Sequence, residues 1–138
     1  MSIDGPPPAG PRGVIGRDAE DAAVRHLGAL GWSIMARNLR IGRAEVDIVA
    51  LEPGRRPTVV LIEVRSHSGP GFGSPMESVD ARKVHRLYGA ALALSRDGHQ
   101  AITSVPQSAV WRVDLVALQR DGATGWTVAA HVRGLEPP

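Results

Sequence analysis

Two short stretches, residues 45–51 (EVDIVAL) and residues 58–65 (TVVLIEVR), are rich in β-branched residues and carry acids among apolar side chains. The linker between them contains Pro53, Gly54 and Pro57, which are typical of a turn. We therefore predict two strands joined as a β-hairpin. The run TVVLIEV is apolar on both of its faces, which predicts a central strand covered on both sides of the sheet.

The rest of the chain has the patterns of further helices and strands around this hairpin. We expect a helix over residues 16–30, a strand over 32–41, a Gly/Ser/Pro loop over 66–75, a helix over 76–95, and strands over 109–118 and 125–132. The predicted order is α-β-β-β-α-β-β in one α/β domain spanning residues 14–133. A flexible N-terminal tail (1–13) and a C-terminal tail (134–138) are expected to flank it.

Composition excludes several functional classes. The 138 residues include no cysteine, which excludes disulfides, thiolate metal sites and a cysteine nucleophile. No apolar stretch approaches the roughly 20 residues that span a bilayer, so we expect no membrane association. The N-terminus lacks the pattern of a signal peptide, so we expect a cytoplasmic location.

Basic residues are almost all arginine. Of the 16 basic residues, Lys83 alone is lysine, and the formal net charge is only +2. Arginine presents a planar fork of donors that suits phosphate. The same heavy use of Arg, Ala and Gly is also typical of a GC-rich genome, so composition leaves both interpretations open.

Acidic side chains interrupt both central strands. Residues two apart on a strand share a face, so Glu45 should point with Asp47, and Glu63 with Arg65. Two facing carboxylates repel each other unless a cation lies between them. Oxygen ligands without cysteine favour Mg²⁺ or Mn²⁺. The alternative is that these acids are solvated strand ends, with Glu63 paired to Arg65.

These acids belong to a longer ordered set that resembles the YraN-like family of small, uncharacterised bacterial proteins. The set comprises Glu20, Asn38, Arg40, residues 44–49 (AEVDIV), residues 62–65 (IEVR), residues 72–75 (FGSP), Lys83 and residues 112–114 (RVD). That family is similar to the PD-(D/E)xK, or restriction-endonuclease-like, superfamily, which includes Holliday-junction resolvases. The resemblance implies an αβββαβ core, with a central mixed sheet flanked by helices, that acts on nucleic acid with Mg²⁺.

The resemblance also implies roles for individual residues. Asp47 and Glu63 match the metal-binding acids, and Glu20 matches the helix acid that helps to hold metal or water. Arg65 occupies the place where the superfamily usually has a lysine. Arginine stays protonated and cannot act as a base, although it can stabilise charge on a phosphate. The implied catalytic set is therefore Glu20, Asp47, Glu63 and Arg65.

Other basic residues are candidates for contact with nucleic acid. Lys83 and Arg86 lie on the second predicted helix, and Arg40 and Arg43 follow the first predicted strand and its turn. Side chains in such places contact phosphates without reading sequence. Taken alone, each is more simply interpreted as a solvated surface charge.

Three functions remain open at this point. The leading hypothesis is a Mg²⁺-dependent endonuclease that acts on DNA, including branched forms. The others are a binding module that keeps the nuclease fold without cleavage, and a protein-interaction domain. A homodimer would suit a symmetric substrate, although nothing in the chain requires one.

Overall fold

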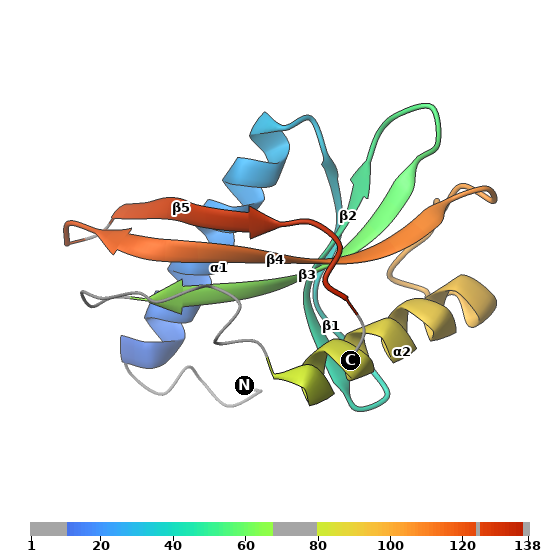
Figure 1. Cartoon of the computed structure of the whole chain (residues 1–138), viewed down its shortest axis with the longest axis horizontal. Coiled ribbons are helices and arrows are strands. Elements are labelled where there is room, and N and C mark those ends of the chain that lie inside the picture. Colours follow the sequence, from blue (N-terminus) through green and yellow to red (C-terminus); the bar gives the residue numbers. More distant parts are fainter. Residues whose placement is uncertain (1–10, 68–79, 124, 137–138) are drawn as a thin grey trace.

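A computed structural model of the chain describes residues 11–67, 80–123 and 125–136. Within these ranges two helices and five strands follow in the order α-β-β-β-α-β-β (Figure 1). They are α1 (Pro11–Ala29), β1 (Ser33–Ile41), β2 (Ala44–Glu52), β3 (Thr58–His67), α2 (Ala81–Asp97), β4 (Val110–Asp121) and β5 (Gly125–Val132). This order confirms the predicted α/β class and its restriction-endonuclease-like αβββαβ core, with β5 added after it.

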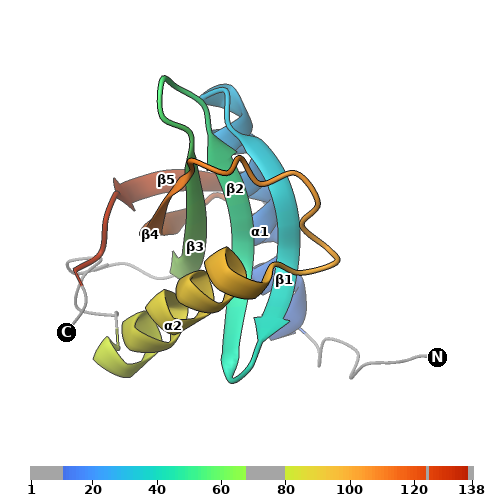
Figure 2. The same cartoon turned by 90° about the vertical axis from the view of Figure 1, so that its right-hand side faces the viewer.

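The strands form a mixed sheet in the order β1-β2-β3-β4-β5. β3 and β4 run parallel, and the other neighbours are antiparallel. A parallel pair needs a crossover connection, which α2 provides. The two helices lie on opposite faces of the sheet (Figure 2). On β3, Leu61 packs in the core beneath α2 and Ile62 in the core beneath α1, which confirms a strand covered on both sides.

Both helices begin at different residues from those predicted. α1 begins at Pro11 rather than at residue 16, because proline is tolerated in the first turn of a helix. Residues 11–13, which we assigned to the tail, are therefore helical. α2 begins at Ala81 rather than at Met76, because Asp80 is extended and its carboxylate caps the helix by accepting from the Arg82 N–H at 2.9 Å. Most of the predicted loop and residues 76–79 lie outside the described residues. No helix within the described ranges is long and apolar enough to cross a membrane.

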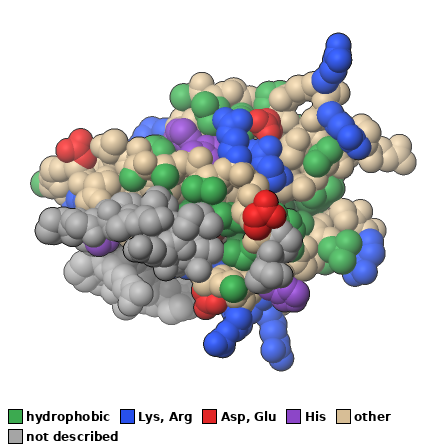
Figure 3. Space-filling model, viewed as in Figure 1, with side chains coloured by type: hydrophobic (Ala, Val, Ile, Leu, Met, Phe, Trp, Pro, Cys, Tyr) green, Lys and Arg blue, Asp and Glu red, His purple; other side chains and the backbone are tan. Residues whose placement is uncertain are grey.

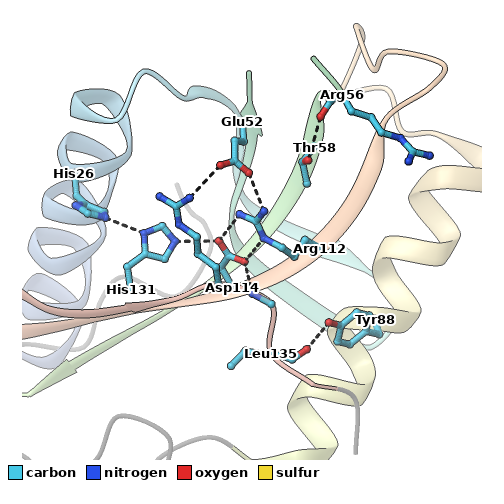
Figure 4. Close-up of polar contacts among 11 residues, drawn as sticks. His26, Glu52, Arg56, Thr58, Tyr88, Arg112, Asp114, His131 and Leu135 are labelled. Atoms are coloured by element: carbon cyan, nitrogen blue, oxygen red, sulfur yellow. Dashed lines mark hydrogen bonds and ion pairs between the residues drawn. The ribbon is translucent and has the colours of Figure 1, made fainter. Parts of the chain in front are cut away.

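The C-terminal segment is part of the domain at residues where we predicted a tail. Leu135 is buried, and its backbone N–H donates to the carbonyl of Val113 at 2.7 Å. The hydroxyl of Tyr88 on α2 donates to the Leu135 carbonyl (Figure 4). The side chain of Leu135 thus packs in the core beneath α2, and its backbone N–H and carbonyl both form hydrogen bonds, which hold the C-terminal segment against this face of the sheet.

A buried polar network surrounds Asp114 on β4 (Figure 4). The guanidinium of Arg112 donates to both carboxylate oxygens, at 2.8 and 3.0 Å, and the Gly134 N–H donates at 3.0 Å. His131 Nε2 donates at 2.9 Å, since an ionised carboxylate only accepts. His131 Nδ1 lies 3.0 Å from Nε2 of His26 on α1. The network thus joins α1, β4, β5 and the C-terminal segment.

Asp114 keeps its charge despite complete burial. Burial opposes ionisation, but the hydrogen bonds from His131, Arg112 and Gly134 outweigh it and hold the pKa of Asp114 below its ordinary value. A carboxyl with a lowered pKa stabilises the folded state above its ordinary pKa. That stabilisation is lost as the pH falls from there through the lower folded pKa.

We predict that Asp114→Ala lowers the free energy of unfolding by about 3 kcal/mol at neutral pH, because Arg112 and His131 lose their partner. The difference from the unmodified protein should shrink as the pH falls below about 4, the ordinary range of an aspartate, because the unfolded chain then binds a proton that folded Asp114 resists. Urea denaturation at the two pH values measures both effects. Asp97→Ala, at the exposed end of α2, is the matched control, and equal losses for the two variants would contradict the role assigned to Asp114.

Candidate metal centre

Asp47 lies where β2 separates from β3. The two strands pair from Glu52 and Thr58 up to Ile48 and Ile62, and the pairing stops there. Beyond the last pair, the Val64 N–H donates to Oδ2 of Asp47 at 2.8 Å. A side-chain carboxylate therefore replaces the backbone acceptor that continued pairing would have supplied. The divergence of the strands creates the position that Asp47 fills.

The predicted alternation of side chains along β2 breaks at Asp47. Val46 and Ile48 are two residues apart, yet Val46 packs in the core beneath α2 and Ile48 in the core beneath α1. β2 is free of β3 on this side of Ile48, which allows the strand to turn. Glu45 is exposed and pairs with Arg40 at 3.1 Å. Glu45 therefore points to solvent and Asp47 toward Glu63, although regular alternation predicted a common face.

Glu63 is buried on β3, with a side chain that is only 4% exposed. Its Oε2 lies 2.9 Å from Nζ of Lys83 on α2. Oε2 also lies 3.2 Å from Nε of Arg65, but this second contact does not have the geometry of a hydrogen bond. Its Oε1 is buried and has no donor in the part of the chain that the structure describes. A buried carboxylate oxygen without a donor is costly. Glu63 thus retains a coordination position for a cation.

The carboxyls of Asp47 and Glu63 lie within hydrogen-bonding reach of each other: in addition to burial, the charge of Asp47 raises the pKa of Glu63, whereas the hydrogen bond with Glu63 lowers that of Asp47. Burial, and next the charge of Asp47, raise the pKa of Glu63 to about 7 against the opposing effects of Lys83 and Arg65. Burial also raises the pKa of Asp47, although the Val64 N–H and Lys83 oppose it. Near neutral pH Glu63 is therefore close to the midpoint of its titration.

Glu20 on α1 approaches the same site from the other side. Burial, and next the charge of Asp47, raise its pKa, while hydrogen bonds from Asn38 and Arg37 oppose that rise. Arg37 Nη2 lies 3.5 Å from Glu20 and 2.8 Å from Asp21. Across the described ranges, no three His, Cys, Asp or Glu side chains form a group that could hold a metal. Asp47 and Glu63 thus lie together, and Glu20 lies nearby, where it is held by Arg37 and Asn38.

Asn38 is a neighbour of the site to which sequence analysis assigned no role in the chemistry. It lies on β1 between the residues paired with Ile48 and Val46, and so opposite Asp47. Its backbone is left-handed, with φ at 53°, a conformation that asparagine tolerates better than most residues. This backbone accompanies the hydrogen bond of its side chain to Glu20. An asparagine in the middle of a predicted strand was the available signal, since asparagine is depleted in strands.

Of the four predicted nucleic-acid-binding residues, three line one pocket and the fourth, Arg40, does not. Lys83 contacts Glu63 and therefore belongs to the acid pair, which its place on a charged helix face did not reveal. Arg43 and Arg86 line a pocket together with Lys83. Arg40 lies outside that pocket and is paired with Glu45.

The side chains present fit a hard divalent cation. Asp47 and Glu63 supply oxygen ligands only, and one oxygen of Glu63 has no donor among the described residues. Mg²⁺ is commonly bound through one or two carboxylates, with water and substrate phosphates completing its shell. A pair of carboxylates, rather than a closed cage, is therefore suited to Mg²⁺ or Mn²⁺.

Comparisons with known proteins point to one family. Residues 19–118 match the sequence model described as "Uncharacterised protein family UPF0102". A UPF0102 protein of Acidothermus cellulolyticus is 37% identical over 136 residues, covering 91% of this chain and 96% of the relative. One of Sorangium cellulosum is 42% identical over 92 residues, covering 67% of this chain and 62% of the relative. A solved structure, Pyrococcus furiosus SfsA in complex with Ca²⁺, is 13% identical with a TM-score of 0.39, covering 89% of this chain and 64% of that chain.

The raised pKa of Glu63 predicts how stability depends on pH. Between its ordinary value and about 7, the folded protein binds more protons than the unfolded chain, so stability falls as the pH rises through this window. Without metal, we expect the free energy of unfolding to fall by about 2 kcal/mol more in the unmodified protein than in Glu63→Gln between about pH 5 and pH 8.

Urea denaturation at the two pH values measures this difference. Glu45→Gln is the matched control, because it removes an exposed acid from the neighbouring strand. It should follow the unmodified protein. A Glu63→Gln variant that lost stability as steeply as the unmodified protein would show that Glu63 does not titrate in this window.

Proposed function

The chain belongs to the uncharacterised protein family UPF0102, and from its paired carboxyls we propose that it binds nucleic acid and hydrolyses phosphodiester bonds in DNA with Mg²⁺ or Mn²⁺. Membership confirms the family resemblance seen in the sequence. The observation that carries the proposed activity is the pair Asp47 and Glu63. Its carboxyls lie together on diverging strands, have raised pKa values, and include a buried oxygen without a donor among the described residues.

Asp47 and Glu63 would hold the metal. A divalent ion bound there would polarise a phosphoryl oxygen and lower the pKa of a bound water. The two residues contribute the negative charge that offsets the ion, and the Val64 N–H fixes the orientation of Asp47. Glu20, held by Arg37 and Asn38, would orient water at the edge of the site.

Lys83 brings an ammonium group to the site, where β3 itself carries Arg65 at the position that is usually lysine in the restriction-endonuclease-like superfamily. Its Nζ lies 2.9 Å from Glu63, and it reaches the site from α2 rather than from β3. A lysine ammonium has three donors on a flexible stem, so it can keep one contact with Glu63 and turn another toward a phosphate. We assign to Lys83 the stabilisation of charge on the attacked phosphate, with Arg65 assisting.

A non-catalytic binding module is the second candidate. Arg65 favours it, because arginine cannot accept a proton from water as a lysine of lowered pKa can. In that case the acid pair and its metal would bind a phosphate without cleaving the strand. The two candidates share the metal site and differ only in turnover.

Incubation with linear, nicked and four-way-junction DNA in Mg²⁺, Mn²⁺ or EDTA separates the candidates. We expect cleavage that needs the metal and falls by more than about 100-fold in Asp47→Asn, because even residues that only support metal ligands are worth about 10–100-fold. Asp97→Asn, which changes an exposed acid at the far end of α2, should cleave like the unmodified protein.

Cleavage that survives EDTA or Asp47→Asn would sink the metal mechanism. Metal-dependent binding without any cleavage would establish the binding module instead. If no DNA binds even at low salt, where phosphate-driven affinity is strongest, both candidates fail and a protein-interaction domain remains.

A further inference from the structure

A small pocket opens between the β1–β2 turn and α2, beside the acid pair. Its volume is about 140 Å³, and it is lined by Arg43, Ala44, Glu45, Lys83, Arg86 and Leu87. Figure 3 shows Lys and Arg side chains projecting from the lower edge of the molecule, where Figure 1 places the start of α2 and the β1–β2 turn. Lys83 lines the pocket and also contacts Glu63, so the pocket and the acid pair share a wall.

The charges around this pocket are not balanced. Glu45 is its one acid, and Arg40 already pairs with Glu45 at 3.1 Å. Lys83 is engaged by Glu63. Arg43 and Arg86 have no ion pair or hydrogen bond to any residue in the described ranges. Two arginines from different elements therefore line a cavity whose one acid, Glu45, is paired with Arg40.

Guanidinium groups bind phosphate through paired, charge-assisted hydrogen bonds. Ala44 and Leu87, both buried, form the apolar part of the pocket lining. The α2 N-terminus does not compete for the same ligand, because Asp80 already caps it. The chemistry of the pocket is thus that of a single oxyanion site.

We propose that this pocket is a phosphate subsite, in which Arg43 and Arg86 bind a phosphate next to the one held at Asp47 and Glu63 on the same nucleic-acid strand. This assignment rests on the proposed function, because the acid pair fixes where the strand lies. Lys83, between the two sites, contacts both phosphates. Such contacts position the strand without reading its sequence.

A double variant, Arg43→Ala with Arg86→Ala, tests the subsite through DNA binding rather than cleavage. In Ca²⁺ or EDTA, we expect binding to weaken by about 10-fold, equally for unrelated sequences. The slope of log affinity against log salt should fall by about one. Arg55→Ala is the matched control, because Arg55 is an exposed arginine at the opposite end of β2, and it should bind like the unmodified protein.

Neutral methylphosphonates placed singly along a short strand locate the phosphate. One position should weaken binding by the unmodified protein and have no further effect on the double variant, since the two changes remove the same contact. If each methylphosphonate weakens both proteins equally, or the double variant binds like Arg55→Ala, the subsite is refuted. A loss that depends on base sequence refutes it as well.

The outcome also separates this subsite from the proposed activity. Loss of binding with the matching methylphosphonate effect supports the subsite even if no DNA is cleaved. Absence of DNA binding by the unmodified protein at low salt overturns both. An unchanged urea midpoint in the double variant shows that the fold is intact, as expected for two exposed side chains.

Discussion

Two like-charged carboxyls, Asp47 and Glu63, lie together at the point where β2 leaves β3 between two apolar cores. Burial opposes the ionisation of both, and the charge of Asp47 further opposes that of Glu63. The Val64 N–H and the ammonium of Lys83 offset part of that cost, and a shared proton offsets more near neutral pH. A divalent cation between the two carboxylates would offset the cost of ionising both, which is the physical basis of the proposed metal site.

The other elements surround the point at which β2 separates from β3. Glu63 lies on β3, the central strand of the sheet. β3 pairs in parallel with β4, so the connection between them, which contains α2, must cross over one face of the sheet. That crossing brings Lys83 onto Glu63 from outside the sheet. α1 covers the opposite face and carries Glu20 to the side of Asp47. The Asp114 network lies on β4 and holds α1, β5 and the C-terminal segment to this frame.

Sequence pattern predicted the order of the elements and the pairing of the two acids. Alternating and continuous apolar runs indicate burial directly, so the β2–β3 hairpin and the covering of β3 on both faces could be predicted from the sequence. The turn of β2 at Asp47 was not, because it depends on where strand pairing stops in three dimensions. The contact of Lys83 with Glu63 depends on how α2 crosses the sheet, which periodicity within the helix does not specify. The burial of Leu135 likewise required partners distant in sequence, Val113 and Tyr88.

In the proposed metal site, a divalent cation replaces the proton of the acid pair. Calorimetric titration with Mn²⁺ at about pH 6, repeated in buffers of different ionisation enthalpy, counts the protons released on binding. We expect one binding site that releases a proton at about pH 6, releases less at about pH 8, and is lost in Glu63→Gln. Mn²⁺ binding that is undiminished in Glu63→Gln and releases no proton, or no binding at all, would contradict it.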